Sequence, residues 1–82
     1  MINVHVKFFA LARDIAGTGE KILRVPSGST ASSVLGTLVA EIPGLERWKN
    51  HLRIAVNCEY VSLQHTLSDR DEVAIIPPVS GG

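Results

Sequence analysis

Apolar and polar residues alternate along the start of the chain. Between positions 2 and 8, every second residue is apolar: Ile2, Val4, Val6 and Phe8. This period of two predicts a strand with one buried face. The same alternation predicts further strands at residues 21–25, 52–56 and 72–76 and a short one at 60–61. Phe9 falls on the opposite face of the first strand, with Asn3, His5 and Lys7.

Two segments have helical spacing instead. Residues 10–16 predict a short helical turn closed by Gly17 and Gly19. A longer helix is expected after Ser29 or Thr30, either of which can cap its first turn. Its apolar residues recur at three- and four-residue steps and form one face: Val34, Leu35, Leu38, Val39 and Ile42.

Turn-forming residues separate these elements. Pro43-Gly44 ends the long helix, and other turns are expected at residues 26–28, 57–59 and 68–71. Segment 45–51 has no clear period, and we expect Trp48 to pin it to the body as a lid on the core.

The order of elements predicts an α+β fold, a roll of the β-grasp type. In such a roll a mixed sheet of four or five strands packs on one main helix. Placing the last strand beside the first, in parallel, would centre the two most apolar strands. A chain of 82 residues has room for one core, so we expect a single domain over residues 1–82.

Composition narrows the classes of partner. Eight basic and eight acidic residues cancel, whereas nucleic-acid binding normally needs a basic stripe. One cysteine excludes a disulfide framework. The first residues lack a signal-peptide pattern, and no apolar run is long enough to span a membrane. We therefore expect a cytoplasmic protein with neither nucleic acid nor membrane as a partner.

The C-terminal tail carries the candidate chemistry: Pro77, Pro78, Val79, Ser80, Gly81 and Gly82. The two prolines cannot donate ladder hydrogen bonds, so the sheet must stop there. An extended segment of this length reaches roughly 20 Å. Gly81 and Gly82 lack side chains and can enter a channel too narrow for other residues. The Gly82 carboxylate is then the group presented there, and adenylation would make it an electrophile that sulfur can attack.

Segments spread over nearly the whole chain carry a family resemblance: Phe8-Phe9-Ala10, Arg13, Gly17, Ala55-Val56-Asn57, Leu67-Ser68-Asp69, Asp71-Glu72-Val73-Ala74 and the tail 77–82. Through them the chain resembles the MoaD family, the small sulfur-carrying subunits of molybdopterin synthase. The most specific part is Asp-Glu-Val-Ala, two residues, then Pro-Pro-Val-Ser-Gly-Gly. Residues 44–51 contribute nothing to the resemblance.

The resemblance implies a carrier cycle. An E1-like adenylating enzyme of the MoeB type activates Gly82 with ATP, and a sulfurtransferase system converts it to a thiocarboxylate. The tail then enters the active site of a MoaE-like large subunit, and sulfur passes to cyclic pyranopterin monophosphate. The family forms a heterotetramer, with two carriers on a large-subunit dimer. Catalytic side chains belong to the large subunit, so the small subunit is expected to be non-catalytic and to bind no cofactor itself.

Apolar residues on the outer strand faces predict a docking surface for these partners. They are Phe9, Ala74 and Ile76, with Ile22 and Tyr60 as further candidates. The resemblance implies that this face, which lies beside the tail, binds both partners. Arg13 matches a family position and could pair with a partner carboxylate; a solvated surface arginine is the competing interpretation.

The remaining reactive side chains have simpler interpretations. The three histidines, His5, His51 and His65, have no ligand spacing, so no metal site is expected. Cys58 lies in an expected turn without a helix N-terminus or a nearby histidine, and we interpret it as incidental. Turn formation and solubility explain the acidic residues near the last strand better than acid–base catalysis: Asp69, Asp71 and Glu72.

Three alternatives stay open. The chain could carry sulfur for another pathway, as ThiS-like proteins do for thiamin, although the double proline and length favour the MoaD type. It could be a ubiquitin-like modifier that joins Gly82 to lysines of target proteins. It could also be a β-grasp interaction domain with an inert tail, because the fold alone does not decide function.

Overall fold

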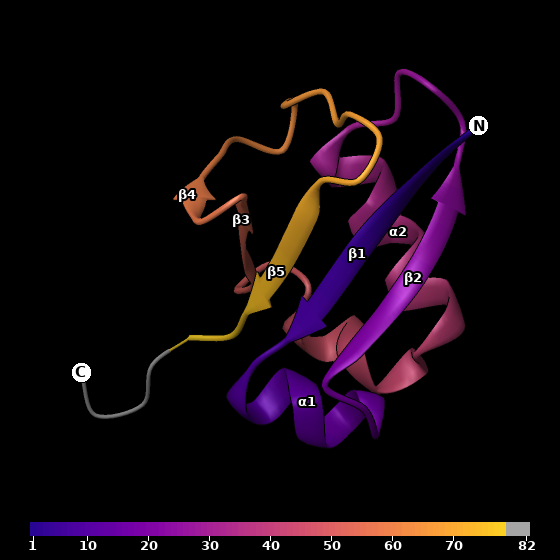
Figure 1. Cartoon of the computed structure of the whole chain (residues 1–82). Helices are drawn as coiled ribbons and strands as arrows, with labels where there is room; N and C mark the ends of the chain where they lie inside the picture. The colour runs from indigo at the N-terminus through magenta and orange to yellow at the C-terminus, as the bar shows by residue number, and fades with distance from the viewer. Residues whose placement is uncertain (79–82) are drawn as a thin grey trace.

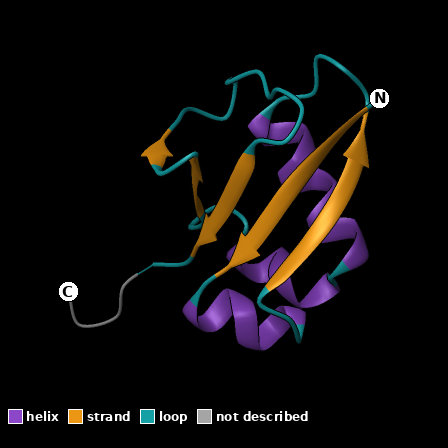
Figure 2. Cartoon of the chain, viewed as in Figure 1, coloured by secondary structure: helices purple, strands orange, loops and turns teal. Residues whose placement is uncertain are grey.

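The computed structural model describes residues 1–78, which form a single sheet with helices on one side (Figures 1 and 2). Residues 79–82 lie outside the described part. In chain order the elements are β1 (Ile2–Phe8), α1 (Ala10–Ala16), β2 (Glu20–Val25), α2 (Ala31–Glu41), the 3-10 helix η1 (Pro43–Trp48), β3 (Arg53–Val56), β4 (Glu59–Tyr60) and β5 (Glu72–Ile76). No helix within residues 1–78 is both long enough and apolar enough to cross a membrane.

The described residues form a five-stranded mixed sheet in the order β2-β1-β5-β3-β4. β5 pairs with β1 in parallel and with β3 antiparallel. The last strand therefore lies beside the first at the centre of the sheet, which confirms the expected β-grasp arrangement. The end of β5, where the tail begins, lies beside the end of β1 and the start of α1 (Figure 1).

One face of the sheet packs on α2 and forms the core. The alternation in β1 buries Val4, Val6 and Phe8, and β5 buries Val73 and Ile75 against them. From α2, the side chains that enter this core lie at helical spacing: Ala31, Val34, Leu35 and Leu38. The other face has no helix over it (Figure 2), so its side chains are available for contacts outside the chain.

Thr30, rather than Ser29, caps α2. Its Oγ1 accepts a hydrogen bond from the Ser33 amide at 3.2 Å, and the Ser33 Oγ accepts one from the Thr30 amide at 2.8 Å. This reciprocal arrangement is a capping box. Carbonyls of the loop that follows β4 accept from the next two amides, Ala31 to His65 at 3.0 Å and Ser32 to Leu63 at 2.8 Å. The cap therefore also ties that loop to α2.

The segment that sequence periodicity left unassigned is a 3-10 helix. Leu45 is fully buried in it, whereas Trp48 is half-buried and packs against the edge of the core. Trp48 is thus a lid, as expected, but Leu45 is the main anchor. Gly44 approaches α1 so closely that a Cβ there would lie 2.7 Å from Cγ2 of Ile15. This close approach fixes η1 against α1.

The acidic turn before β5 holds the strands in register. The Asp71 carboxylate accepts from the Ser68 amide at 2.8 Å and from Nδ2 of Asn57 at 3.0 Å. Asp69 Oδ1 accepts from the Asn3 amide at 2.8 Å. The Asp71 contacts confirm its turn-forming role, whereas Asp69 ties the turn to β1. Together they link β1, the β3–β4 turn and the start of β5.

Candidate functional site

The uncovered face of the sheet becomes apolar toward the end of β5. Register places Ala74 of β5 next to Ala55 of β3, and Ala55 next to Tyr60 of β4. With Phe9 and Ile76 they form what we call the docking face: Phe9, Ala55, Tyr60, Ala74 and Ile76. These five residues, with Cys58 and Glu72, line a shallow hollow of about 230 Å³. Phe9 is 47% exposed and Tyr60 65% exposed, so the face leaves aromatic side chains open to solvent.

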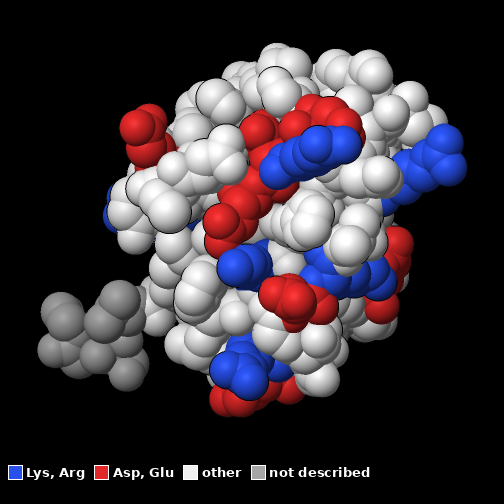
Figure 3. Space-filling view, viewed as in Figure 1, with Lys and Arg blue, Asp and Glu red and all other residues white. Residues whose placement is uncertain are grey.

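Charged side chains border this docking face. The Lys7 ammonium lies 3.1 Å from the Glu72 carboxylate, and the hydrogen bond and charge of Glu72 raise the pKa of Lys7 above its ordinary value. On the other side, the Arg53 guanidinium lies over the Tyr60 ring, 5.2 Å from its centre. In Figure 3, charges gather over the middle of the sheet and around α1, while the described surface at the lower left, beyond the end of β5, shows mostly uncharged atoms. The docking face is therefore an apolar patch with a charged rim.

The tail begins one residue later than the sequence pattern predicts. β5 stops at Ile76, as expected before a proline, but Pro77 is buried and Pro78 is the first exposed residue. The six-residue tail expected from the sequence is thus shortened, because the Pro77 ring packs on the body. We assign Pro77 to the root of the tail rather than to the part that can enter a partner.

A second apolar hollow surrounds this root. We call it the tail-root cleft; its volume is about 610 Å³, and it is lined by Phe9, Ala10, Leu11, Trp48, Ile76, Pro77 and Pro78. Three separate segments meet there: the β1–α1 junction, η1 and the end of β5. Ala10 has a φ of 48°, a left-handed conformation that is strained in a non-glycine residue. Such strain is often retained at functional sites.

The structure brings together four of the five residues predicted for docking. Phe9, Tyr60, Ala74 and Ile76 line one hollow, whereas Arg13 lies on α1, exposed. Within residues 1–78, no carboxylate lies within ion-pair distance of Arg13.

The other predicted residues are Ile22 and the end of the tail. Ile22 is 62% exposed but pairs with His5, beyond the Lys7–Glu72 ion pair, and so stands apart from the docking face. Val79, Ser80, Gly81 and Gly82 lie outside the described residues.

Sequence reasoning missed Ala55, Leu11 and Trp48 as parts of the site. Ala55 could have been found, because the alternation in β3 puts it on the face opposite Ile54 and Val56. Leu11 and Trp48 carry no such signal, because the cleft forms only when distant segments meet. Among the described residues, no group of His, Cys, Asp and Glu side chains is arranged to hold a metal ion.

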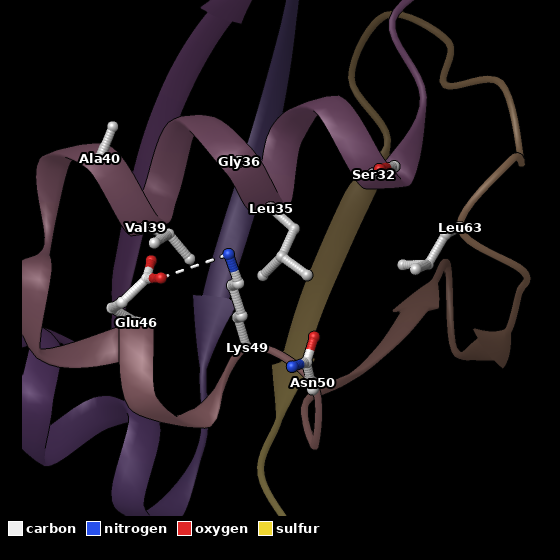
Figure 4. A pocket seen from close by; sticks show the side chains of 9 residues that line it. All are labelled: Ser32, Leu35, Gly36, Val39, Ala40, Glu46, Lys49, Asn50 and Leu63. Atoms are coloured by element: carbon white, nitrogen blue, oxygen red, sulfur yellow. Dashed lines mark ion pairs between the residues drawn. The ribbon is translucent and has the colours of Figure 1, made fainter.

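A further groove of about 530 Å³ lies between α2 and η1. Figure 4 shows Leu35 and Val39 in it and Lys49 reaching toward Glu46, where Nζ and Oε1 are 3.2 Å apart. This groove belongs to the helical layer, and neither the docking face nor the tail contributes a residue to it. It therefore forms no part of the candidate site.

Known proteins resemble this chain over almost its full length. The ThiS family model matches residues 6–82. A molybdopterin synthase sulfur carrier subunit of Arabidopsis thaliana is 41% identical over 81 residues, covering 99% of this chain and 84% of the relative.

Two solved structures extend the comparison. The small archaeal modifier protein 1 (SAMP1) of Methanosarcina acetivorans is similar at a TM-score of 0.82 with 32% identity, covering 100% of this chain and 98% of that one. A chain in the complex of subunits 1 and 2 of the molybdopterin-converting factor of Helicobacter pylori is similar at a TM-score of 0.72 with 26% identity, covering 99% of this chain and 100% of that one.

Proposed function

Because this chain belongs to the ThiS family, we propose that it is a sulfur carrier in molybdenum cofactor biosynthesis. The Gly82 carboxylate carries the sulfur as a thiocarboxylate and delivers it to cyclic pyranopterin monophosphate in a large synthase subunit. The observation that carries the proposal is the apolar docking face at the root of a tail ending in Gly81-Gly82. The proposal is supported by relatives that match nearly the whole chain and are named molybdopterin synthase sulfur carrier subunits.

The chemistry needs no catalytic side chain from this protein. An E1-like adenylating enzyme joins the Gly82 carboxylate to the AMP portion of ATP and releases pyrophosphate. The terminal sulfur of a sulfurtransferase persulfide then attacks the acyl carbon and AMP leaves. A thiol reduces the resulting acyl disulfide, which releases the sulfurtransferase and leaves the thiocarboxylate. The carrier presents a reactive atom, and its partners supply catalysis and exclude water. ATP is therefore used by the partner and is not a cofactor of this chain.

The docking face supplies affinity for the adenylating enzyme and for the large synthase subunit. Phe9, Ala74 and Ile76 provide apolar contact beside the tail, and Tyr60 with Arg53 above it adds a ring suited to an interface. Arg13 is exposed on α1, and we propose that it pairs with a partner carboxylate. The complex of subunits 1 and 2 in Helicobacter pylori supports a large-subunit partner here. We propose that the assembly is a heterotetramer of two carriers on a large-subunit dimer. We place this cycle in the cytoplasm, where a free thiol such as that of Cys58 is maintained.

Intact-mass spectrometry tests the cycle directly. The full chain is incubated with ATP, an adenylating enzyme and a sulfur donor, and we expect a mass gain equal to the exchange of one oxygen for sulfur. Adding a large subunit and the pterin precursor should then return the original mass as product forms. Deleting Gly82, or adding one residue after it, should abolish both changes. A gain of sulfur that persists without Gly82 would refute the carrier role of the tail.

Protein modification is the second candidate, favoured by the similarity to an archaeal modifier protein. The same acyl-adenylate could be attacked by a lysine amine, with AMP leaving and an isopeptide bond forming. Lysine-linked adducts of Gly82 in the native host would identify this use. Finding the thiocarboxylate without such adducts would support the carrier function and exclude protein modification.

A further inference from the structure

The tail-root cleft leaves apolar side chains exposed on the helical side of β5. Leu11 is 38% exposed there and Phe9 47% exposed. Trp48 forms another wall and is the single tryptophan of the sequence. Burying exposed hydrocarbon against a partner is favourable, at roughly 25 cal/mol per Å². A partner bound to the docking face alone would cover Phe9 but would leave Leu11 and Trp48 uncovered.

The length of the tail determines what reaches this cleft. Four residues follow Pro78, ending at Gly82. Fully extended, they span about 13 Å. An active site that encloses Gly82 must therefore have its entrance within that distance of Pro78. Since Pro78 itself lines the cleft, the rim of such an entrance comes against the cleft whenever the tail is fully inserted.

The lining residues specify the chemistry of the contact. All seven are hydrocarbon or aromatic in character, and none carries a formal charge. A charged rim residue placed there would lose hydration without gaining a partner. An aliphatic or aromatic side chain would bury apolar area on both sides.

We propose that the tail-root cleft receives an apolar side chain from the rim of the large subunit's tail-binding channel, with Leu11 and Trp48 as docking residues. The inference rests on the proposed function and deepens it. Phe9 and Ile76 line both this cleft and the hollow of the docking face, so the partner contacts the end of β5 from two sides. That two-sided contact fixes the direction in which the tail enters the channel.

A matched pair of leucine variants tests the contact. Leu11→Gln keeps good helix propensity in α1 while removing the apolar surface. Leu63→Gln is the control, because Leu63 is 43% exposed but lies in the other groove, between α2 and η1. We expect Leu11→Gln to bind the isolated large subunit about tenfold more weakly in calorimetry, and Leu63→Gln to bind like the wild type. Equal Kd values for wild type and Leu11→Gln would overturn the proposal.

A second measurement needs no substitution at the cleft. The carrier is labelled with 5-fluorotryptophan, so that its ¹⁹F resonance reports on Trp48 alone. Adding unlabelled large subunit should shift this resonance. A carrier lacking residues 79–82 should show a smaller shift, because the inserted tail no longer holds the channel rim against the cleft. An unchanged resonance in a saturated complex would exclude the cleft from the interface.

The outcomes separate this inference from the proposed function. If the wild-type carrier does not bind the large subunit at all, the proposed function fails and the inference fails with it. If the wild type binds and Leu11→Gln binds equally well, the function stands and the inference is wrong. If Leu11→Gln impairs adenylation but not large-subunit binding, the cleft serves the adenylating enzyme, and the proposal as stated is also wrong.

Discussion

At the scale of single residues, Glu72 differs from the aspartates that precede it. Asp69 and Asp71 accept hydrogen bonds from backbone amides and hold the turn before β5. The Glu72 side chain instead pairs with Lys7 on the uncovered face, at the border of the docking face. Sequence grouped the three as turn and solubility residues, because an acidic run does not reveal which side chain lies opposite a lysine of another strand.

The Lys7–Glu72 pair predicts a specific titration. Glu72 raises the pKa of Lys7 above its ordinary 10.5. While the Glu72 carboxylate is ionised, the pair stabilises the fold fully at pH values below 10.5, and this contribution is lost as the pH rises through the higher folded-state pKa of Lys7. NMR titration of the lysine side chains should show the Lys7 midpoint falling toward 10.5 in Glu72→Gln. Glu59→Gln, which also removes a carboxylate, should leave it in place; a Lys7 midpoint unaffected by Glu72→Gln would contradict the assignment.

At the scale of elements, periodicity predicted most of the fold. Alternation identified β1, β2, β3 and β5. In β1, β2 and β5 it also identified the buried face, because one side of the sheet meets α2 and the other does not. The 3-10 helix η1 could not be predicted in this way, since its conformation follows from Leu45 entering the core and Gly44 fitting against Ile15. Both are tertiary contacts that no local pattern encodes.

Two glycines at helix positions should respond oppositely to alanine. Gly17 ends α1 with a φ of 75°, whereas Gly36 lies inside α2, and a Cβ at either position meets no atom within 4 Å. Gly36→Ala should therefore stabilise the protein by about 0.5–1 kcal/mol through helix propensity. Gly17→Ala should destabilise it by about 1–2 kcal/mol through left-handed strain. Urea denaturation measures both, and changes of the same sign would contradict the conformational explanation.

At the scale of the whole molecule, the tail-root cleft lies at one end of the sheet. The ends of β1 and β5, the start of α1 and η1 all meet around the root of the tail (Figure 1). The sequence predicted Phe9, Ala74 and Ile76 as docking residues because strand alternation exposes them. It added Tyr60 because this residue follows the β3–β4 turn and Tyr is favoured at interfaces. It did not predict the cleft, whose walls are separated by dozens of positions along the chain.

Cys58 offers a test of docking on the intact protein. It is exposed and free, and it lines the hollow of the docking face. Alkylation of the carboxylate form of the carrier should therefore slow severalfold when the large subunit is added, because the partner covers the thiol. The control is the double variant Ser27→Cys, Cys58→Ser, whose thiol lies in the turn after β2. Its alkylation rate should be the same with and without the large subunit. Equal rates for Cys58 with and without a saturating partner would place the interface elsewhere.

The position of β5 has a mechanical consequence. The strand that continues into the tail is paired on both sides, with β1 and with β3. A pull on the tail along the strand axis would therefore load both hydrogen-bond ladders in shear, with many bonds sharing the force, instead of opening them one at a time. When the spent carrier is withdrawn from a tight channel, the body should come away folded rather than unravel from its C-terminal end.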